Sequence, residues 1–211
     1  MAGYFDAVVQ PLDFHLDGQQ GLMGWWRYRK LRLAADELKA GIEGGVRRTG
    51  STVIPPAPRQ RRCVAHLVVE RRNFLLPLLE YAAAVDDTTL DEFYRGASRS
   101  RFLHLLDHDV NSGVFVPVDF ETPFYHRSRH LQGAVSIGSS VRLHAELESL
   151  HRRLGVDLTP RVEAMKEFVH AHASELEGQG ESNKFWVQFA FIVLMKLSQL
   201  SLHHRYPILL R

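Results

Sequence analysis

Apolar side chains recur at three- and four-residue steps in several segments of this chain, and this spacing constrains the fold more than any other feature. Such spacing places the apolar residues of a segment on one face of a helix. The segments are residues 25–42, 74–85, 98–106, 141–154 and, in a helix that Pro160 opens, 162–169, and a long apolar helix is expected at 183–202. The sequence therefore predicts a mainly α, helical bundle-like fold, with an α+β fold as the alternative.

Short signals mark where these helices begin and end. Glycines at 41, 44 and 45 are expected to end the first helix. Asn73 is expected to cap the second helix, which ends at Asp86-Asp87, and Thr88 or Thr89 starts a short helix that runs to Tyr94. Ser139 or Ser140 caps the helix that Gly155 ends.

Three short runs have the composition of strands. Residues 63–69 are rich in β-branched side chains and are predicted as a strand, with a helix as the rival interpretation. Residues 114–118 are β-like, and residues 206–210 are expected to add an extended edge. These runs predict a small β hairpin or edge sheet beside the helices. Residues 1–21 are expected to form an irregular arm.

Length and cysteine content set the organisation and the compartment. The 211 residues suit a single globular domain over residues 1–211, with a Pro-rich connection at 49–58. Cys63 is the only cysteine, which excludes intramolecular disulfides and makes a reducing compartment the default. Residues 1–6 lack the pattern of a signal peptide, and the apolar stretch 185–200 is short and interrupted by polar residues. We therefore expect a soluble cytoplasmic protein without a membrane partner.

The charge balance argues against a nucleic-acid ligand. The chain has 26 basic and 24 acidic side chains, which gives a net charge of +2. Its most basic stretch, residues 44–69, lies in a region without aromatic side chains between Tyr28 and Phe74. Aromatic platforms that stack on bases are therefore missing from that stretch.

The segment 107–113 resembles an EF-hand calcium loop in its first half. Asp107, Asp109 and Asn111 place oxygen ligands at alternate positions, as calcium loops do. The glycine comes one place late, and the bidentate glutamate at position twelve is missing. An ordinary turn after a helix is the competing interpretation, because Asp, Asn and Gly are common turn residues.

Histidines near this loop extend the candidate metal site. His104 and His108 are four residues apart, as are His126 and His130, and this spacing can present two imidazoles to one metal. Twelve histidines in 211 residues give about 0.7 such pairs by chance, so the spacing alone decides little. The candidate ligands for a divalent metal of the Ca or Zn class are His104, Asp107, His108, Asp109, Asn111, His126 and His130.

A second candidate site is a helix start that can bind a small anion. Ser139 and Ser140 precede a predicted helix, whose first backbone N–H groups attract anions. Arg142, Arg127 and Arg129 add positive charge nearby, and residues 122–145 contain no acidic side chain. An ordinary serine cap is the alternative.

No catalytic signature is assembled in the sequence. The patterns G-x-S-x-G, G-x-x-x-x-G-K-[ST] and G-x-G-x-x-G are absent. We therefore expect a non-enzymatic protein-interaction or ligand-binding domain, whose partner is another protein or a second copy of the chain. The alternatives are a metal-dependent enzyme, hydrolase-like, that uses residues 104–130, and a small-anion-binding module at residues 137–142. The sequence leaves the partner and the oligomeric state open.

Overall fold

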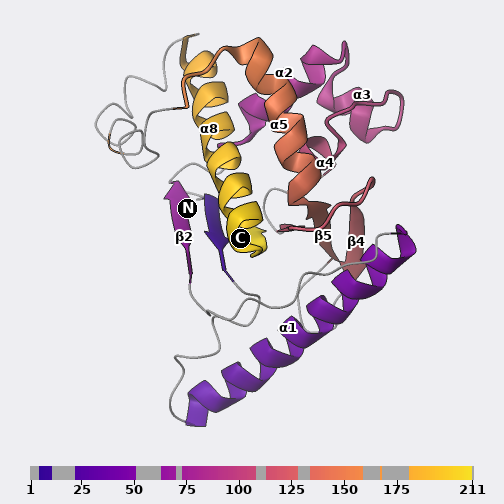
Figure 1. Cartoon of the computed structure of the whole chain (residues 1–211), viewed down its shortest axis with the longest axis vertical. Helices are drawn as coiled ribbons and strands as arrows, with labels where there is room; N and C mark the ends of the chain where they lie inside the picture. The colour runs from indigo at the N-terminus through magenta and orange to yellow at the C-terminus, as the bar shows by residue number, and fades with distance from the viewer. Residues whose placement is uncertain are drawn as a thin grey trace.

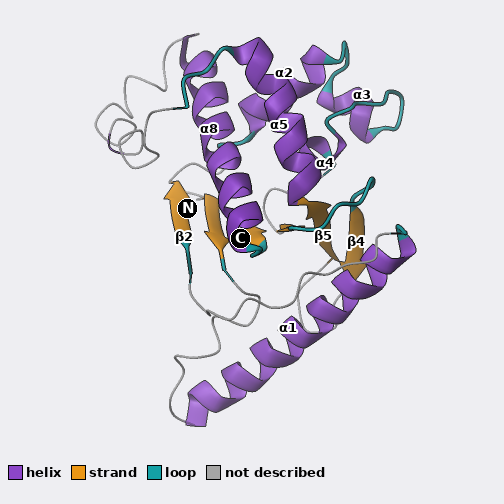
Figure 2. Cartoon of the chain, viewed as in Figure 1, coloured by secondary structure: helices purple, strands orange, loops and turns teal. Residues whose placement is uncertain are grey.

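The computed structural model describes most of the chain around a six-stranded mixed sheet (Figures 1 and 2). It covers residues 5–10, 22–50, 63–69, 73–107, 113–127, 134–158, 167 and 181–210, with the backbone alone for 5–6, 22–32 and 181–182. Of the described residues 55% are helical and 19% lie in strands. The fold is α+β, so the prediction of a mainly helical bundle with a small hairpin is wrong.

The sheet joins strands from both ends of the sequence. Its order is β2-β1-β6-β3-β5-β4, and all neighbouring pairs are antiparallel except β3 and β5. The bounds are β1 Phe5–Val9, β2 Ala65–Val69, β3 Gly113–Val116, β4 Phe124–Arg127, β5 Ala134–Ser139 and β6 Ile208–Leu210. The expected arm at 1–21 therefore contains an internal strand, and the expected edge at 206–210 lies between β1 and β3.

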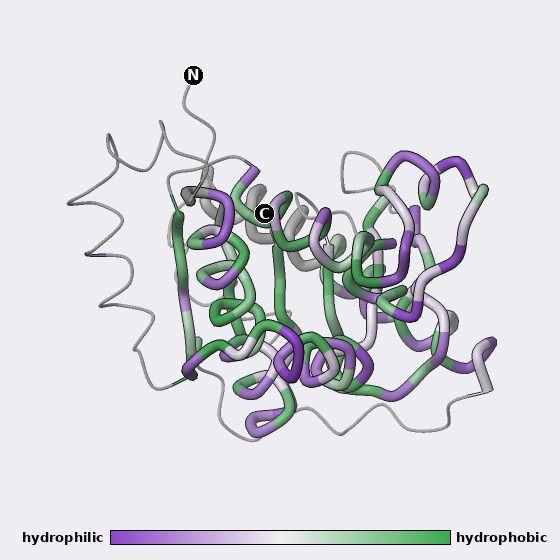
Figure 3. The backbone as a smooth tube through the Cα atoms, turned by 90° about the horizontal axis from the view of Figure 1, so that it is seen from above, coloured by the Kyte–Doolittle hydropathy of each residue, from purple (hydrophilic) through white to green (hydrophobic). Residues whose placement is uncertain are grey.

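Helices cover both faces of the sheet. The helices are α1 Leu22–Arg48, α2 Leu76–Val85, α3 Leu90–Tyr94, α4 Leu103–Leu106, α5 Ser140–Leu154 and α8 Glu181–His204. One apolar core joins residues of α2, α4, α5 and α8 to one face of the sheet, and a second core joins α1 to the other face. In Figure 3 the most apolar stretches are the strands and the helices packed beside them.

Alternating side chains on the strands build these two cores. On β3, Phe115 joins the core under α2, α4, α5 and α8, whereas Val114 and Val116 join the core under α1. On β6, Ile208 and Leu210 face the first core and Leu209 packs against the second. This two-residue period is the ordinary consequence of a pleated strand. It shows that both faces of the sheet are covered.

The first helix runs through the glycines that were predicted to end it. A Cβ on Gly41 would lie 2.5 Å from the His126 ring, and one on Gly45 would overlap the Phe124 ring. These glycines therefore let α1 approach β4 closely, and the helix continues to Arg48. The first half of α1 projects beyond the sheet (Figure 1).

Several local predictions are confirmed. Residues 65–69 form a strand, Thr89 caps α3 in a capping box with Glu92, and Ser139 caps α5. Gly155 ends α5 in the left-handed conformation, at φ 58°. The cap of α2 is Leu75 instead of Asn73, and only residues 103–106 of the predicted 98–106 helix are helical. The prediction for 51–58 lies outside the described residues, and of the helix predicted from Pro160 only residue 167 is described, as helical.

Helix α8 is long and apolar enough to cross a membrane by length and composition. Residues 183–204 pass this test, although the sequence analysis judged the shorter stretch 185–200 insufficient. In the structure 67% of the most apolar window is buried within the protein, where it packs against α2, α5 and the sheet. A buried core helix has the same composition as a membrane span, and the observed packing accounts for it.

Candidate functional site

His104 is a buried residue that connects three separate parts of the fold. Its side chain is 1% exposed. The backbone N–H of Ser139 donates to its Nδ1 over 3.0 Å, and its Nε2 lies 3.1 Å from the Glu121 carbonyl. Because Nδ1 accepts, the proton must be on Nε2, which donates to Glu121. Burial lowers the pKa of His104 to about 4, so the ring is neutral.

Glu146 extends from α5 to the start of α4. Its two carboxylate oxygens accept from the backbone N–H groups of His104 and Leu105, each over 2.9 Å. Burial raises the pKa of Glu146 to about 8, while these two hydrogen bonds and the charge of Arg142 act in the opposite direction. Glu146 thus satisfies two amides that a helix leaves without intrahelical partners.

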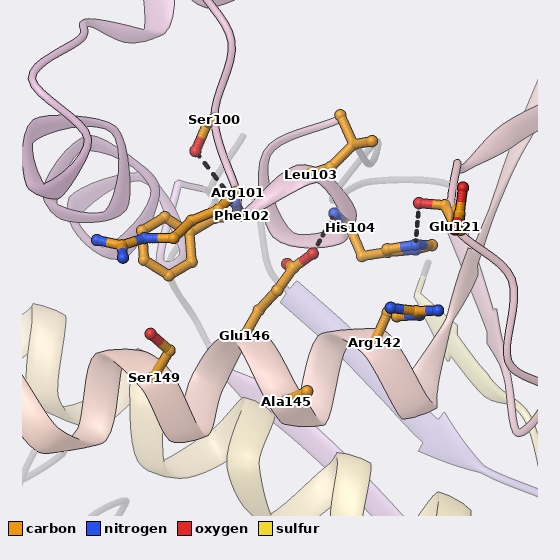
Figure 4. Close-up of a pocket in the computed structure, with 10 residues that line it drawn as sticks. All are labelled: Ser100, Arg101, Phe102, Leu103, His104, Glu121, Arg142, Ala145, Glu146 and Ser149. Atoms are coloured by element: carbon orange, nitrogen blue, oxygen red, sulfur yellow. Dashed lines mark hydrogen bonds between the residues drawn. The ribbon is translucent and has the colours of Figure 1, made fainter.

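A cavity of about 400 Å³ lies between α5 and the segment 100–104. Figure 4 shows the Glu146 side chain crossing this space. Ser149 and Arg101 lie to one side of Glu146, and Arg142 and Glu121 lie to the other. Arg101 pairs with Asp86 at 2.9 Å, and Arg142 pairs with Asp119. Both arginines at the cavity are therefore already engaged by carboxylates.

The predicted anion site is occupied by the protein's own hydrogen bonds. Ser139 and Ser140 are fully buried. The Ser139 hydroxyl donates to the Val118 carbonyl over 2.6 Å and accepts from the Arg142 amide over 3.1 Å, and the Ser201 hydroxyl donates to Ser140. The structure brings Ser139, Ser140 and Arg142 together. Arg127 is exposed on β4, and Arg129 lies outside the described residues.

The structure describes only three of the seven predicted metal ligands. Both ring nitrogens of His104 are engaged, and His126 packs against α1 beside Gly41. Asp107 accepts a hydrogen bond of 3.3 Å from the Tyr125 hydroxyl. His108, Asp109, Asn111 and His130 lie outside the described residues. Within the described part, no three His, Cys, Asp or Glu side chains form a group suited to a metal ion. Ion binding by the loop at 107–111 stays a prediction.

An acidic surface at α2 and α3 was not singled out by the sequence analysis. Residues 80–94 contain five acidic side chains and no basic one. We call this set the acidic corner: Glu80, Asp86, Asp87, Asp91 and Glu92. All except Asp86 are exposed. The signal that could have identified it is the run of acids itself, of which the sequence analysis used only Asp86-Asp87, as a helix end.

Hydrogen bonds hold part of the acidic corner in place. The Glu92 carboxylate accepts from the Thr89 backbone N–H over 2.9 Å, and the Thr89 hydroxyl accepts from the Glu92 amide over 3.2 Å. The bonds from the Thr89 backbone and side chain lower the pKa of Glu92, so this carboxylate stays ionised. Asp91 pairs with Arg95 over 3.4 Å at the surface. The corner is therefore a charged surface on an ordered helix pair.

Residues 60–210 match the model of a family described as "Putative DNA-mimic protein". The chain belongs to this family. The match includes the acidic corner and the cavity, whereas β1 and α1 precede it. No curated protein and no solved structure matches the chain.

Family membership corrects the functional prediction. It points to a protein that imitates DNA, so the generic ligand-binding domain, the metal-dependent enzyme and the small-anion module are all wrong. The prediction that the partner is a protein is confirmed. The prediction that nucleic acid is not a ligand is compatible with membership of this family.

Proposed function

We propose that this protein binds a DNA-binding protein on the surface that otherwise contacts DNA. The family match supports this proposal, and the acidic corner is the feature of the structure that suits it. Proteins that contact DNA do so largely through Lys and Arg side chains placed on phosphates. Exposed carboxylates on the corner would take the place of those phosphates.

The corner gathers several exposed carboxylates within a short stretch of chain. Asp91 and Glu92 are neighbours in the first turn of α3, and Asp87 lies in the turn between α2 and α3. They can therefore meet several basic side chains of one partner at the same time.

Because the whole chain has a net charge of +2, any surface that imitates DNA must be an acidic region on a protein that is not acidic overall. Residues 60–210 carry 18 acidic and 17 basic side chains, whereas the rest of the chain carries 6 and 9. A uniformly acidic protein would attract any basic surface, but a local acidic surface also fixes orientation. We also propose a cytoplasmic location, because a chain with a single cysteine suits a reducing compartment. Self-association stays a prediction.

Competition with DNA tests this function. Proteins eluted from a duplex-DNA column are passed over the immobilised protein, and free duplex DNA is then added. We expect bound proteins that the duplex releases, because both ligands need the same surface. Retention should also weaken steeply as salt rises, since the attraction is between exposed charges. The proposal fails if no DNA-binding protein is retained, or if the duplex releases none of those retained.

A further inference from the structure

The cavity between α5 and residues 100–104 contains a carboxylate with unused hydrogen-bonding capacity. Glu146 lines the cavity, and each of its oxygens accepts one backbone N–H bond of 2.9 Å. A carboxylate offers about four acceptor positions, two on each oxygen. One position on each oxygen is therefore left over, so each oxygen can accept one further N–H bond.

The charged groups around Glu146 leave the cavity negative. Arg142 on α5 and Arg101 beside α4 pair with Asp119 and Asp86 respectively. Glu121, on the loop before β4, adds a further carboxylate at the rim, and His104 on α4 is neutral. Asp86 and Asp119 do not line the cavity, but they balance the two arginines that do, so with Glu146 ionised the whole group has four carboxylates and two guanidinium groups. The balance of two negative charges favours a cation over an anion in this space.

We propose that this cavity receives an arginine side chain of the protein partner, whose guanidinium pairs with both oxygens of Glu146. The inference rests on the proposed function, because a protein that contacts DNA phosphates presents arginines on the same surface. Arginine fits better than lysine, since its planar group donates two parallel N–H bonds to a carboxylate. A volume of about 400 Å³ also admits the whole side chain.

Binding of the guanidinium is coupled to release of a proton. Burial raises the pKa of Glu146 to about 8, so at pH 6 most molecules hold the carboxyl proton. The cation binds the ionised form, and the proton passes to solvent. Affinity should therefore rise about tenfold per pH unit between pH 6 and pH 7.5 and become constant above pH 9.

An arginine peptide tests the cavity without the natural partner. The probe is the peptide acetyl-Gly-Arg-Gly-amide, added up to about 50 mM because a single ion pair binds weakly. We expect saturable shifts of the His104 and Leu105 amide signals in NMR spectra, with tighter binding at pH 8.5 than at pH 6. The corresponding glutamate peptide should produce no such shifts. Unsaturable shifts, or equal ones with both peptides, would overturn the proposal.

Two variants of α5 identify the group responsible. Glu146→Gln removes the charge with little change in shape, and it should weaken binding at least about tenfold and abolish the pH dependence. Glu148→Gln removes an exposed acid two residues away on the same helix, and it should bind like the unmodified protein. If Glu146→Gln does not retain the NMR spectrum of the folded protein, the pH dependence measured on the unmodified protein decides alone.

These outcomes are separate from those of the proposed function. If the protein competes with DNA but the arginine peptide does not bind at Glu146, the cavity proposal fails and the DNA-mimic function stands. If the peptide binds with the expected pH dependence but no DNA-binding protein is retained, the proposed function fails. Glu146 then binds a guanidinium group, but the claim that this group comes from a DNA-binding protein fails.

Discussion

His104 and Glu146 show why single residues could not be assigned from the sequence. His104 is a predicted metal ligand in the sequence because another histidine follows four residues later. Its actual partners are Ser139 and Glu121, which lie 35 and 17 residues away. Glu146 was not selected, because nothing in its neighbourhood indicates that it reaches the amides of residues 104 and 105. Contacts of this kind depend on the tertiary fold, which local spacing does not encode.

The buried imidazole makes the fold sensitive to acid. The pKa of His104 is about 4 in the folded protein and about 6.5 when unfolded, so the unfolded state gains a proton first as pH falls. The free energy of unfolding should therefore decrease from pH 6.5 down to pH 4, by about 3 kcal/mol at most. Urea unfolding across this range measures the decrease. His104→Gln should show a smaller decrease, and an equal one would contradict the assignment.

Glu146 gives stability the opposite dependence on pH: it makes the folded protein less stable as pH rises. Its pKa is higher in the folded protein, about 8, than the ordinary 4.5, so the folded state holds the proton more tightly. The protonated carboxyl therefore adds its full amount to the free energy of unfolding below pH 4.5. This stabilisation is lost as pH rises from 4.5 to 8. We expect Glu146→Gln to be less stable at pH 5 yet to lose less stability between pH 5 and pH 8. Parallel unfolding curves of both proteins against pH would refute this expectation.

At the scale of elements, the sequence predicted the helices better than the sheet. Helix α5 was predicted with its Ser139 cap and its Gly155 end, because these signals are local. β1 was missed, and the extended run at 206–210 was predicted without its partners, because β1 and β6 pair across almost the whole chain. β5 was missed, and it pairs with β3 in parallel, an arrangement that no short turn can connect. Pairing of distant short strands leaves little trace in local sequence.

Two neighbouring glycines of α1 test the packing of that helix on β4. Gly44→Ala should stabilise the protein by about 0.5–1 kcal/mol, because nothing lies within 4 Å of the added Cβ and alanine favours the helix. Gly45→Ala should destabilise it by about 1–3 kcal/mol, because the added Cβ would overlap the Phe124 ring. Thermal and urea unfolding measure both changes. Similar effects of the two substitutions would contradict the observed register of α1 on β4.

At the scale of the whole molecule, the overall composition concealed the acidic corner. A net charge of +2 averages an acidic corner with a basic first helix, which carries seven basic and three acidic side chains. The two lie on opposite sides of the sheet, since α2 belongs to one core and α1 to the other. The sequence alone supported a protein partner, and the family match is what supports the proposal that this partner binds DNA.

Displacement of proteins from immobilised duplex DNA tests the central claim most directly. The unmodified protein should release bound DNA-binding proteins as its concentration rises. A variant that neutralises three exposed acids of the corner, Glu80→Gln, Asp87→Asn and Asp91→Asn, should need at least about tenfold more protein, and added salt should reduce the difference.

The control variant carries Asp36→Asn, Glu37→Gln and Glu43→Gln on α1. It changes the net charge by the same amount as the corner variant, but its substitutions lie outside residues 60–210, which match the family. It should displace the DNA-bound proteins as well as the unmodified protein does. Equal displacement curves for the corner variant and the unmodified protein, or no displacement by either, would contradict the account.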